Sequence, residues 1–310
     1  MKTIKDVREI LTPVQVRRLL WEDGDGRTRP VASHRAVVEC DSGRTLGVVG
    51  AGYKLVTNGE ALGYGRACAA RLFGATADDM EVFNVLAPRT RSFCHIDLIH
   101  PAHEVHLLER EIYLPFVRVT NSYNTTRALR FDVGYCRKIC LNGVIFGKYS
   151  IRFTFSHTRD GLRETPNFEA GVHKLEGLRA SFLGIAERLM GFAVTEDEAL
   201  ALVFRGLGLP VPKESAEGPG REAFRALRDN ARERVGRYQA DLGSNAYAAF
   251  NAMTDLASHP PDIPRFRRSP HSLQTAAGAW AEEFGKLVAA GEGFDFGAYL
   301  GDWRQVIGRN

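Results

Sequence analysis

The order of strand-like and helix-like patterns limits the fold of this chain more than any other sequence feature. From residue 81 to residue 157 the segments have strand patterns, and from residue 168 to residue 289 they have helix patterns. Strands followed by helices are typical of an α+β fold and not of a doubly wound parallel sheet. The sequence therefore predicts an α+β fold, with a mainly antiparallel sheet from the N-terminal and central parts covered by C-terminal helices.

The clearest strand pattern runs from Phe146 to His157, where polar and mostly aromatic residues alternate. The polar set comprises Lys148, Ser150, Arg152, Thr154 and Ser156, and the other set comprises Tyr149, Ile151, Phe153, Phe155 and His157. A period of two places the two sets on opposite faces of a strand. We expect one face to pack on a core and the other to meet solvent or a ligand.

Signals at the ends of segments divide the remaining chain. Apolar residues at helical spacing predict an N-terminal helical segment over residues 1–30, and a short strand is expected at 53–56. Asn58 is a candidate cap for a helix that Gly74 ends in the left-handed conformation. The predicted domains that follow are a core over 31–260, with a sheet over 31–165 and helices over 166–260, and a C-terminal helical extension over 261–310.

Composition excludes several classes of protein. The five cysteines are odd in number and scattered, which argues against a disulfide framework. No run of about 18 apolar residues exists, so we expect no membrane span. The N-terminus lacks the apolar region of a secretory signal, which predicts a cytoplasmic protein.

The basic residues are concentrated in one central stretch. The net charge is only +4, but nine basic and two acidic residues lie between Arg118 and Arg163, giving that segment +7 and the remainder −3. Such asymmetry can mark a face that binds a polyanion. It is equally typical of a solvated sheet face.

Two patterns suggest cofactor or metal chemistry but are incomplete. Gly47, Gly50 and Gly52 resemble the start of a dinucleotide fingerprint, yet strand-like residues follow where a helix is required. The four histidines from His95 to His106 could hold zinc or iron, but they lack the spacing of an HExxH or HxH site. We therefore predict no cofactor and no metal site.

A reactive thiol is the third incomplete pattern. Arg137 and Lys138 lie between Cys136 and Cys140, and adjacent cations lower the pKa of a thiol. Two small buried residues explain the same pattern, and no histidine–acid partner is identifiable. We assign no catalytic residue, and the sequence leaves enzymatic activity open while favouring a protein that is not an enzyme.

Three motifs carry a resemblance to a known family. They are Val117-Arg118-Val119-Thr120-Asn121-Ser122-Tyr123-Asn124, Ala128-Leu129-Arg130-Phe131 and Arg137-Lys138-Ile139-Cys140-Leu141-Asn142-Gly143. They resemble the phage/plasmid-like proteins of domain of unknown function 932, and the likeness extends over residues 31–260. The chain departs from the family pattern at Asn124-Thr125-Thr126, where a turn with Asp is usual, and at Lys138-Ile139. The resemblance implies an origin in phages, prophages or plasmids and no agreed reaction.

The same motifs supply candidate nucleic-acid-binding residues. Cations match phosphates, amides suit base edges and aromatic rings stack on bases. The candidates are Arg118, Asn121, Tyr123, Asn124, Arg127, Arg130, Arg137, Lys138, Lys148 and Arg152. An alternative interpretation is that Asn121, Ser122 and Asn124 only build a turn through their side chains.

The favoured function is that of a mobile-element protein that binds nucleic acid. Single-stranded DNA is the favoured ligand, in a recombination or annealing-like role through the central basic face. Such a role is compatible with homo-oligomers and needs no membrane. One alternative is a protein-interaction factor that counters host restriction or defence. A second is a metal-dependent enzyme acting on nucleotides or nucleic acid, with the region from His95 to His106 as its metal site.

Overall fold

The computed structural model describes residues 2–4, 6–108, 111–147, 151–164, 166–212, 218–263, 266 and 268–303. The chain forms two compact units, neither of which is one continuous segment. Unit 1 comprises residues 1–104, 114–133 and 151–175, and unit 2 comprises residues 105–113, 134–150 and 176–310. This division does not follow the predicted boundaries at residues 30, 165 and 260, because central strand segments contribute to both units.

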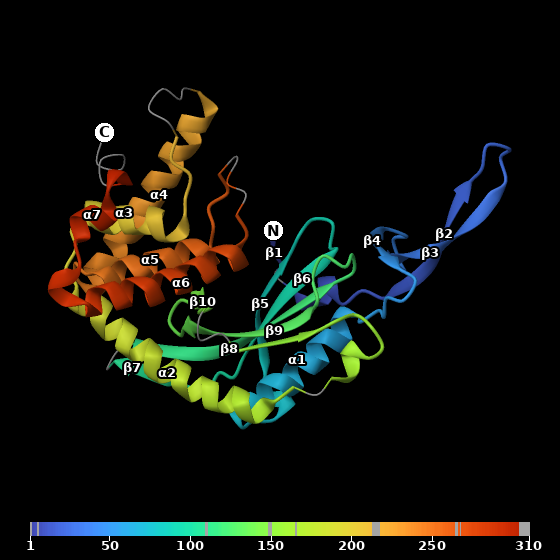
Figure 1. Ribbon diagram of the computed structural model, residues 1–310, viewed down its shortest axis with the longest axis horizontal. Coiled ribbons are helices and arrows are strands. Elements are labelled where there is room, and N and C mark those ends of the chain that lie inside the picture. Colours follow the sequence, from blue (N-terminus) through green and yellow to red (C-terminus); the bar gives the residue numbers. More distant parts are fainter. Residues whose placement is uncertain are drawn as a thin grey trace. The chain divides into compact units, whose positions relative to one another are not determined.

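Most of the strands lie in unit 1 (Figure 1). Its elements are β1 (Lys2–Thr3), η1 (Val7–Ile10), β2 (Val14–Glu22), β3 (Thr28–Glu39), β4 (Thr45–Gly50), α1 (Asn58–Phe73), η2 (Ala77–Asp79), β5 (Glu81–Ala87), β6 (Phe93–Ile99), β11 (Arg152–Phe155) and η3 (Gly161–Arg163). Three elements contribute residues to both units: β8 (Glu111–Ser122), β9 (Leu129–Arg137) and α2 (Phe168–Gly191).

Unit 2 contains most of the helices. Its own elements are β7 (Val105–Leu108), β10 (Gly143–Val144), α3 (Glu196–Leu207), α4 (Pro219–Leu242), α5 (Ala246–Ser258), α6 (Pro270–Ala289), η4 (Gly291–Gly293) and α7 (Phe296–Leu300). Within this unit, Phe182 of α2 packs against Tyr113 and Tyr135 near the strand ends. A Cβ on Gly278 of α6 would meet the Ile145 carbonyl oxygen at 2.2 Å, so the helix lies directly on that backbone. The predicted α+β fold is confirmed.

The strands of unit 1 form two antiparallel sheets. In the larger one β1, β5, β6 and β8 are consecutive neighbours, β9 follows β8, and β11 pairs with β9. The smaller sheet has the order β2-β3-β4. The register places Asp97 opposite Arg118 and Asp132 opposite Arg152, and both pairs matter for the site below.

Helix α1 covers one face of the larger sheet. The sequence forms a helix there because of a capping box. The Thr57 side chain accepts from the Glu60 backbone N–H, and the Glu60 carboxylate accepts from the Thr57 backbone N–H. Gly74 ends the helix with a φ of 65°, as predicted. The predicted cap was one residue off, because the Asn58 side chain donates to the Ile10 carbonyl instead. A Cβ on Gly65 would meet Val119 at 2.2 Å, which shows how closely α1 lies on the sheet.

The predicted N-terminal helical segment is wrong. Residues 7–10 form one short 3-10 turn, and residues 14–22 form strand β2, which pairs with β3. Short apolar segments fit both periods, and here the loop over residues 23–27 allows a hairpin whose partner strand decides the outcome. Residues 53–56 do not form the predicted strand. The Lys54 backbone N–H donates to the His157 carbonyl, but this single hydrogen bond is not part of a sheet.

The predicted strand from Phe146 to His157 is confirmed only in its second half. Strand β11 comprises Arg152–Phe155, where Arg152 and Thr154 are exposed while Phe155 is buried. Lys148, Tyr149 and Ser150 lie outside the described residues. The alternation of faces therefore holds over the described part of the segment.

Candidate functional site

The family-like motif at the end of β8 lies inside unit 1. Asn121 is fully buried, and its amide donates to the Val56 carbonyl and to Asn58 Oδ1, both at 2.9 Å. The Tyr123 hydroxyl accepts from the backbone N–H of Asn58 at 2.9 Å, and burial raises the pKa of Tyr123. These two predicted ligand-binding residues connect β8 to the start of α1.

Strand β4 packs directly on this motif. A Cβ placed on Gly47 would lie 2.2 Å from the Tyr123 carbonyl oxygen and 2.7 Å from Asn124 Cα, both backbone atoms. Tyr123 also forms a core cluster with Val37, Leu46 and Val49 of the small sheet. The glycine once compared with a dinucleotide fingerprint is therefore needed for close packing.

Replacement of Gly47 by alanine is expected to destabilise unit 1 by about 1–3 kcal/mol, because backbone atoms must move to accommodate the methyl group. Gly50→Ala is the matched control, since a Cβ there meets nothing within 4 Å. Urea unfolding followed by circular dichroism compares the two variants. Equal midpoints for both would show that the β4 contact is loose.

The residues after β8 form a turn through their side chains. Asn124 Oδ1 accepts from the hydroxyls of Ser122 and Thr126, at 2.8 and 2.6 Å, and from the Thr126 amide at 3.2 Å. Thr125 has a φ of 59°. The turn interpretation therefore holds for Ser122 and for half-buried Asn124, which accepts all three hydrogen bonds, but not for Asn121, whose side chain bonds Val56 and Asn58 instead.

Arg118 and Asp97 form a buried ion pair on the face of the large sheet away from α1. Arg118 Nε donates to Asp97 Oδ1 and its NH2 group to Oδ2, both at 2.6 Å, and both side chains are inaccessible to solvent. Asn84 donates to the same carboxylate at 2.9 Å. Arg118 is therefore an internal residue and not a surface cation.

The same face becomes accessible toward strand β11. Asp132 is buried, and its carboxylate accepts from Arg130 at 2.7 Å and from Arg152 at 2.6 Å. The opposite faces of β9 and β11 carry Phe131 and Phe153, which pack toward the α1 side. The Arg152 side chain is 43% exposed, so its guanidinium reaches the surface while its Nε holds Asp132.

Arg127 lies beside this group. Its guanidinium carbon is 4.7 Å from the centre of the Phe93 ring, a cation–π arrangement. Desolvation, together with the charge of Arg130, lowers the pKa of Arg127, and its Nε has no hydrogen-bond partner. An anion close to Arg127 would therefore be stabilised by the charges of Arg127 and Arg130.

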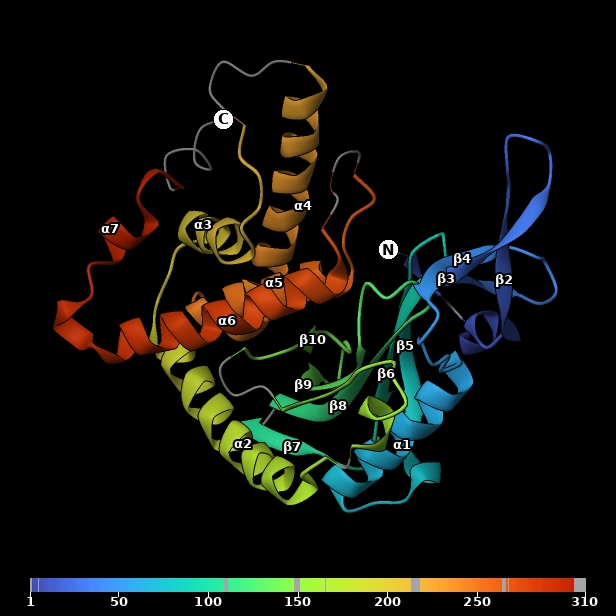
Figure 2. The ribbon, with the colours of Figure 1, turned by 45° about the vertical axis from the view of Figure 1, so that its right-hand side comes forward.

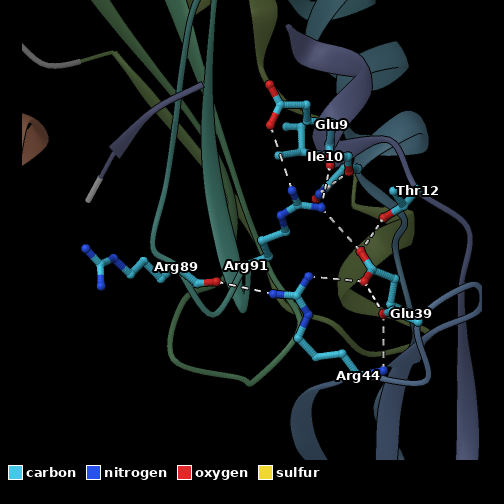
Figure 3. Close-up of polar contacts among 9 residues, drawn as sticks. Glu9, Ile10, Thr12, Glu39, Arg44, Arg89 and Arg91 are labelled. Carbon is cyan, nitrogen blue, oxygen red and sulfur yellow. Dashed lines mark hydrogen bonds and ion pairs between the residues drawn. The ribbon is translucent and has the colours of Figure 1, made fainter. Parts of the chain in front are cut away.

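Beyond Phe93, a second group of arginines surrounds buried Glu39 (Figure 3). The Glu39 carboxylate accepts from Ser42 and from Thr12 at 3.0 Å, and it pairs with Arg44 at 3.3 Å and Arg91 at 3.5 Å. The Ser42 hydrogen bond holds the pKa of Glu39 below its usual range, so the carboxylate stays ionised.

Arg44 and Arg91 also connect the loops around Glu39. Arg44 reaches the Arg89 carbonyl at 3.4 Å, and Arg91 reaches the Glu9 carbonyl at 2.9 Å. Arg91 has a φ of 54°, a conformation that residues other than glycine rarely adopt. Figure 3 shows the Arg89 side chain directed away from Glu39, and Arg89 is exposed.

We call these six residues the arginine rim; its members are Arg44, Arg89, Arg91, Arg127, Arg130 and Arg152. Glu39 joins Arg44 to Arg91, the Arg89 carbonyl accepts from Arg44, and Asp132 joins Arg130 to Arg152. Arg127 packs on Phe93, which lines one small cavity together with Glu39 and Arg91. The described carboxylates in these contacts are Glu9, Glu39 and Asp132. The group therefore has a net charge of +3. Guanidinium groups recognise phosphate through paired N–H donors, so the chemistry of the rim suits phosphate oxygens.

Half of the arginine rim was predicted from the sequence, and half was missed. Arg127, Arg130 and Arg152 were predicted, and the structure brings them together. Arg44, Arg89 and Arg91 were missed because they lie far from the basic stretch in sequence. The only signal was the basic turn Pro88-Arg89-Thr90-Arg91 between two predicted strands.

The remaining predicted residues belong to unit 2. Arg137 is buried and donates to Glu111 at 2.9 and 2.5 Å and to Asp241 at 3.2 Å. Lys138 is exposed in the turn that follows β9, and Lys148 lies outside the described residues. Arg137 is therefore a structural cation, whereas Lys138 remains accessible.

The structure separates most of the histidines and cysteines of the candidate metal and thiol sites, although the rings of His100 and His103 are 6.2 Å apart. Among the described residues, no group of three or more His, Cys, Asp or Glu side chains is arranged to hold a metal ion. His95 is buried and bonds Thr120 Oγ1 at 2.8 Å, while His106 is exposed. Cys136 is buried, and Cys140 is half-buried.

The two units together define an α+β protein with antiparallel sheets and mainly C-terminal helices. Within the described ranges, none of its helices is both long and apolar enough to cross a bilayer. The family model of a domain of unknown function (DUF932) matches residues 45–279. The chain belongs to this family. No curated protein and no solved structure matches it.

Proposed function

We propose that this protein binds nucleic acid through the arginine rim, with single-stranded DNA as the favoured ligand. The observation that carries the proposal is that six arginines from four separate segments of unit 1 are connected by these contacts, which include three carboxylates of the described residues. Two of those carboxylates, Glu39 and Asp132, are buried and therefore compete little for a ligand.

The basic face in this proposal is smaller than the one expected from sequence. Arg118, Asn121, Tyr123 and Arg137 are internal and have structural partners. Tyr123 and Tyr135 are buried, so they are not available for stacking on bases. Guanidinium planes can themselves stack on bases while contacting phosphates, and the rim supplies six of them.

A role in mobile-element recombination or annealing is part of the same proposal. Its support is the resemblance of the motifs to phage/plasmid-like proteins and the general use of basic surfaces by single-strand annealing proteins. A protein-interaction role remains the alternative.

The test is fluorescence anisotropy with labelled single- and double-stranded oligonucleotides over a salt series. We expect single strands to bind more tightly, with an affinity that falls steeply as salt rises, because binding releases counterions. Absence of binding to either oligonucleotide at low salt would contradict the proposal.

A further inference from the structure

Strands β2 and β3 form a hairpin arm that extends beyond the small sheet. Figures 1 and 2 show this hairpin extending away from α1 and β5 of the same unit. Over residues 15–36, β2 and β3 pair with each other, residues 34–36 of β3 also pair with β4, and the ladder shifts register between Arg18 and Leu20. Most side chains of this part are exposed. We call residues 15–36 the arm.

The arm exposes large apolar side chains. Leu20 is 62% exposed and Trp21 is 51% exposed, and the indole is directly opposite Arg29 in the ladder. The chain has three tryptophans, of which Trp280 is buried. An exposed indole on a protruding hairpin, next to guanidinium groups, suits a partner that offers flat rings together with negative charge.

The charges of the arm favour the same kind of partner. Residues 15–20 and 30–36 contain Arg17, Arg18 and Arg35 and no carboxylate, whereas the tip, residues 21–29, contains two arginines and three carboxylates, so the arm has a net charge of +2. Arg18 lies directly opposite Arg35, and like charges in that position destabilise a hairpin. Arg17 and Arg18 form no ion pair with any described residue. An anionic partner would relieve this repulsion.

Trp21 and Arg17 lie on one face of the arm. They are four residues apart on β2. At the register shift β2 advances from Arg18 to Leu20 while β3 advances from Arg35 to Pro30, so the extra residues lie in β3 and β2 keeps its alternation; Leu20 therefore points to the other side. A base stacked on the indole would place its phosphate within reach of a long cationic side chain on that face. Polyanion charge and flat bases occur together in single-stranded nucleic acid.

We infer that the arm is a second contact for single-stranded nucleic acid, with Trp21 stacking on a base and Arg17 contacting a phosphate. The inference rests on the proposed function, since it assigns a further part of the same ligand to the arm. A second copy of the chain is a poorer partner for this surface, because two arms facing each other would oppose arginine to arginine.

The test measures binding of a labelled mixed-sequence single strand to the full chain and its variants. Trp21→Ala is expected to weaken binding roughly ten-fold, within the range that loss of one stacked base costs. Trp21→Phe should retain most of the affinity because a ring remains. Leu20→Ala is the matched control, since it removes an equally exposed apolar side chain from the opposite face and should bind like the wild type.

The outcomes separate the arm from the rim. Wild-type affinity in Trp21→Ala, with binding lost in an Arg89→Glu/Arg127→Glu variant, would overturn the inference and leave the proposed function intact. No binding by the wild type would overturn both. A smaller particle mass of Trp21→Ala in light scattering, with unchanged binding, would overturn the inference and identify the arm as a contact between copies.

Discussion

Replacement of Asp97 by alanine is expected to destabilise unit 1 by about 3–5 kcal/mol, because it leaves the Arg118 guanidinium buried without its counter-ion. The two side chains share two hydrogen bonds of 2.6 Å between adjacent strands. Both are buried, so water cannot take the place of a missing partner. The loss is comparable to the total stability of many domains. Thermal and urea unfolding measure it.

Two variants make this result interpretable. Asp6→Ala removes a pair of similar length from the surface, where Arg8 is 86% exposed, together with the cap of the short 3-10 turn η1, and it should cost no more than about 1 kcal/mol. Asp97→Asn keeps the hydrogen-bonding shape but not the charge, so its stability should lie between those of the wild type and Asp97→Ala. If Asp97→Ala unfolded like the wild type, Arg118 would have access to solvent or to a ligand, and its assignment as an internal residue would be wrong.

Charge reversal at Arg89 and Arg127 is expected to weaken single-strand binding by roughly a hundred-fold at low salt, since charge-assisted hydrogen bonds to two phosphates are lost. These two arginines are chosen because neither forms an ion pair with a described carboxylate, whereas Arg130 and Arg152 both hold buried Asp132. The folded structure should therefore tolerate the change. Anisotropy gives the affinity, and circular dichroism checks the fold.

Arg71→Glu is the control for the overall charge. It reverses one charge, where the rim variant reverses two, and it does so on α1, which covers the other face of the sheet and where Arg71 lies 4.3 Å from the centre of the Phe168 ring. We expect only a small effect on binding. An equal loss in Arg71→Glu and in the rim variant would mean that net charge, and not the rim, attracts the ligand.

The helices and their ends were largely predictable because their signals are local. The Thr195 cap and the left-handed Gly74 follow from residue types within a few positions of each helix end. The hairpin arm was not predictable from its apolar spacing, because Val14 to Trp21 fits a helix until β3 is available to pair with it.

The candidate site was predictable only in part, because charge in a sequence does not say where a side chain points. Arg118 and Arg130 both belong to the basic stretch, yet one is buried against Asp97 and the other reaches the surface beside Asp132. The partner carboxylate decides between these outcomes: Asp97 lies on the neighbouring strand β6, whereas Asp132 lies two residues from Arg130 on the same strand β9. The rim residues Arg44 and Arg91 come together at Glu39, a contact between segments far apart in the sequence.

The slope of log affinity against log salt, measured for the wild type and for Arg89→Glu/Arg127→Glu on the same single strand, tests the central claim most directly. On single strands each phosphate contact contributes a slope of about −0.7, so loss of two contacts should make the slope shallower by about 1.4. Such a change would place phosphates at the arginine rim. Identical steep slopes for both proteins would contradict the account, because the ligand would then be bound elsewhere.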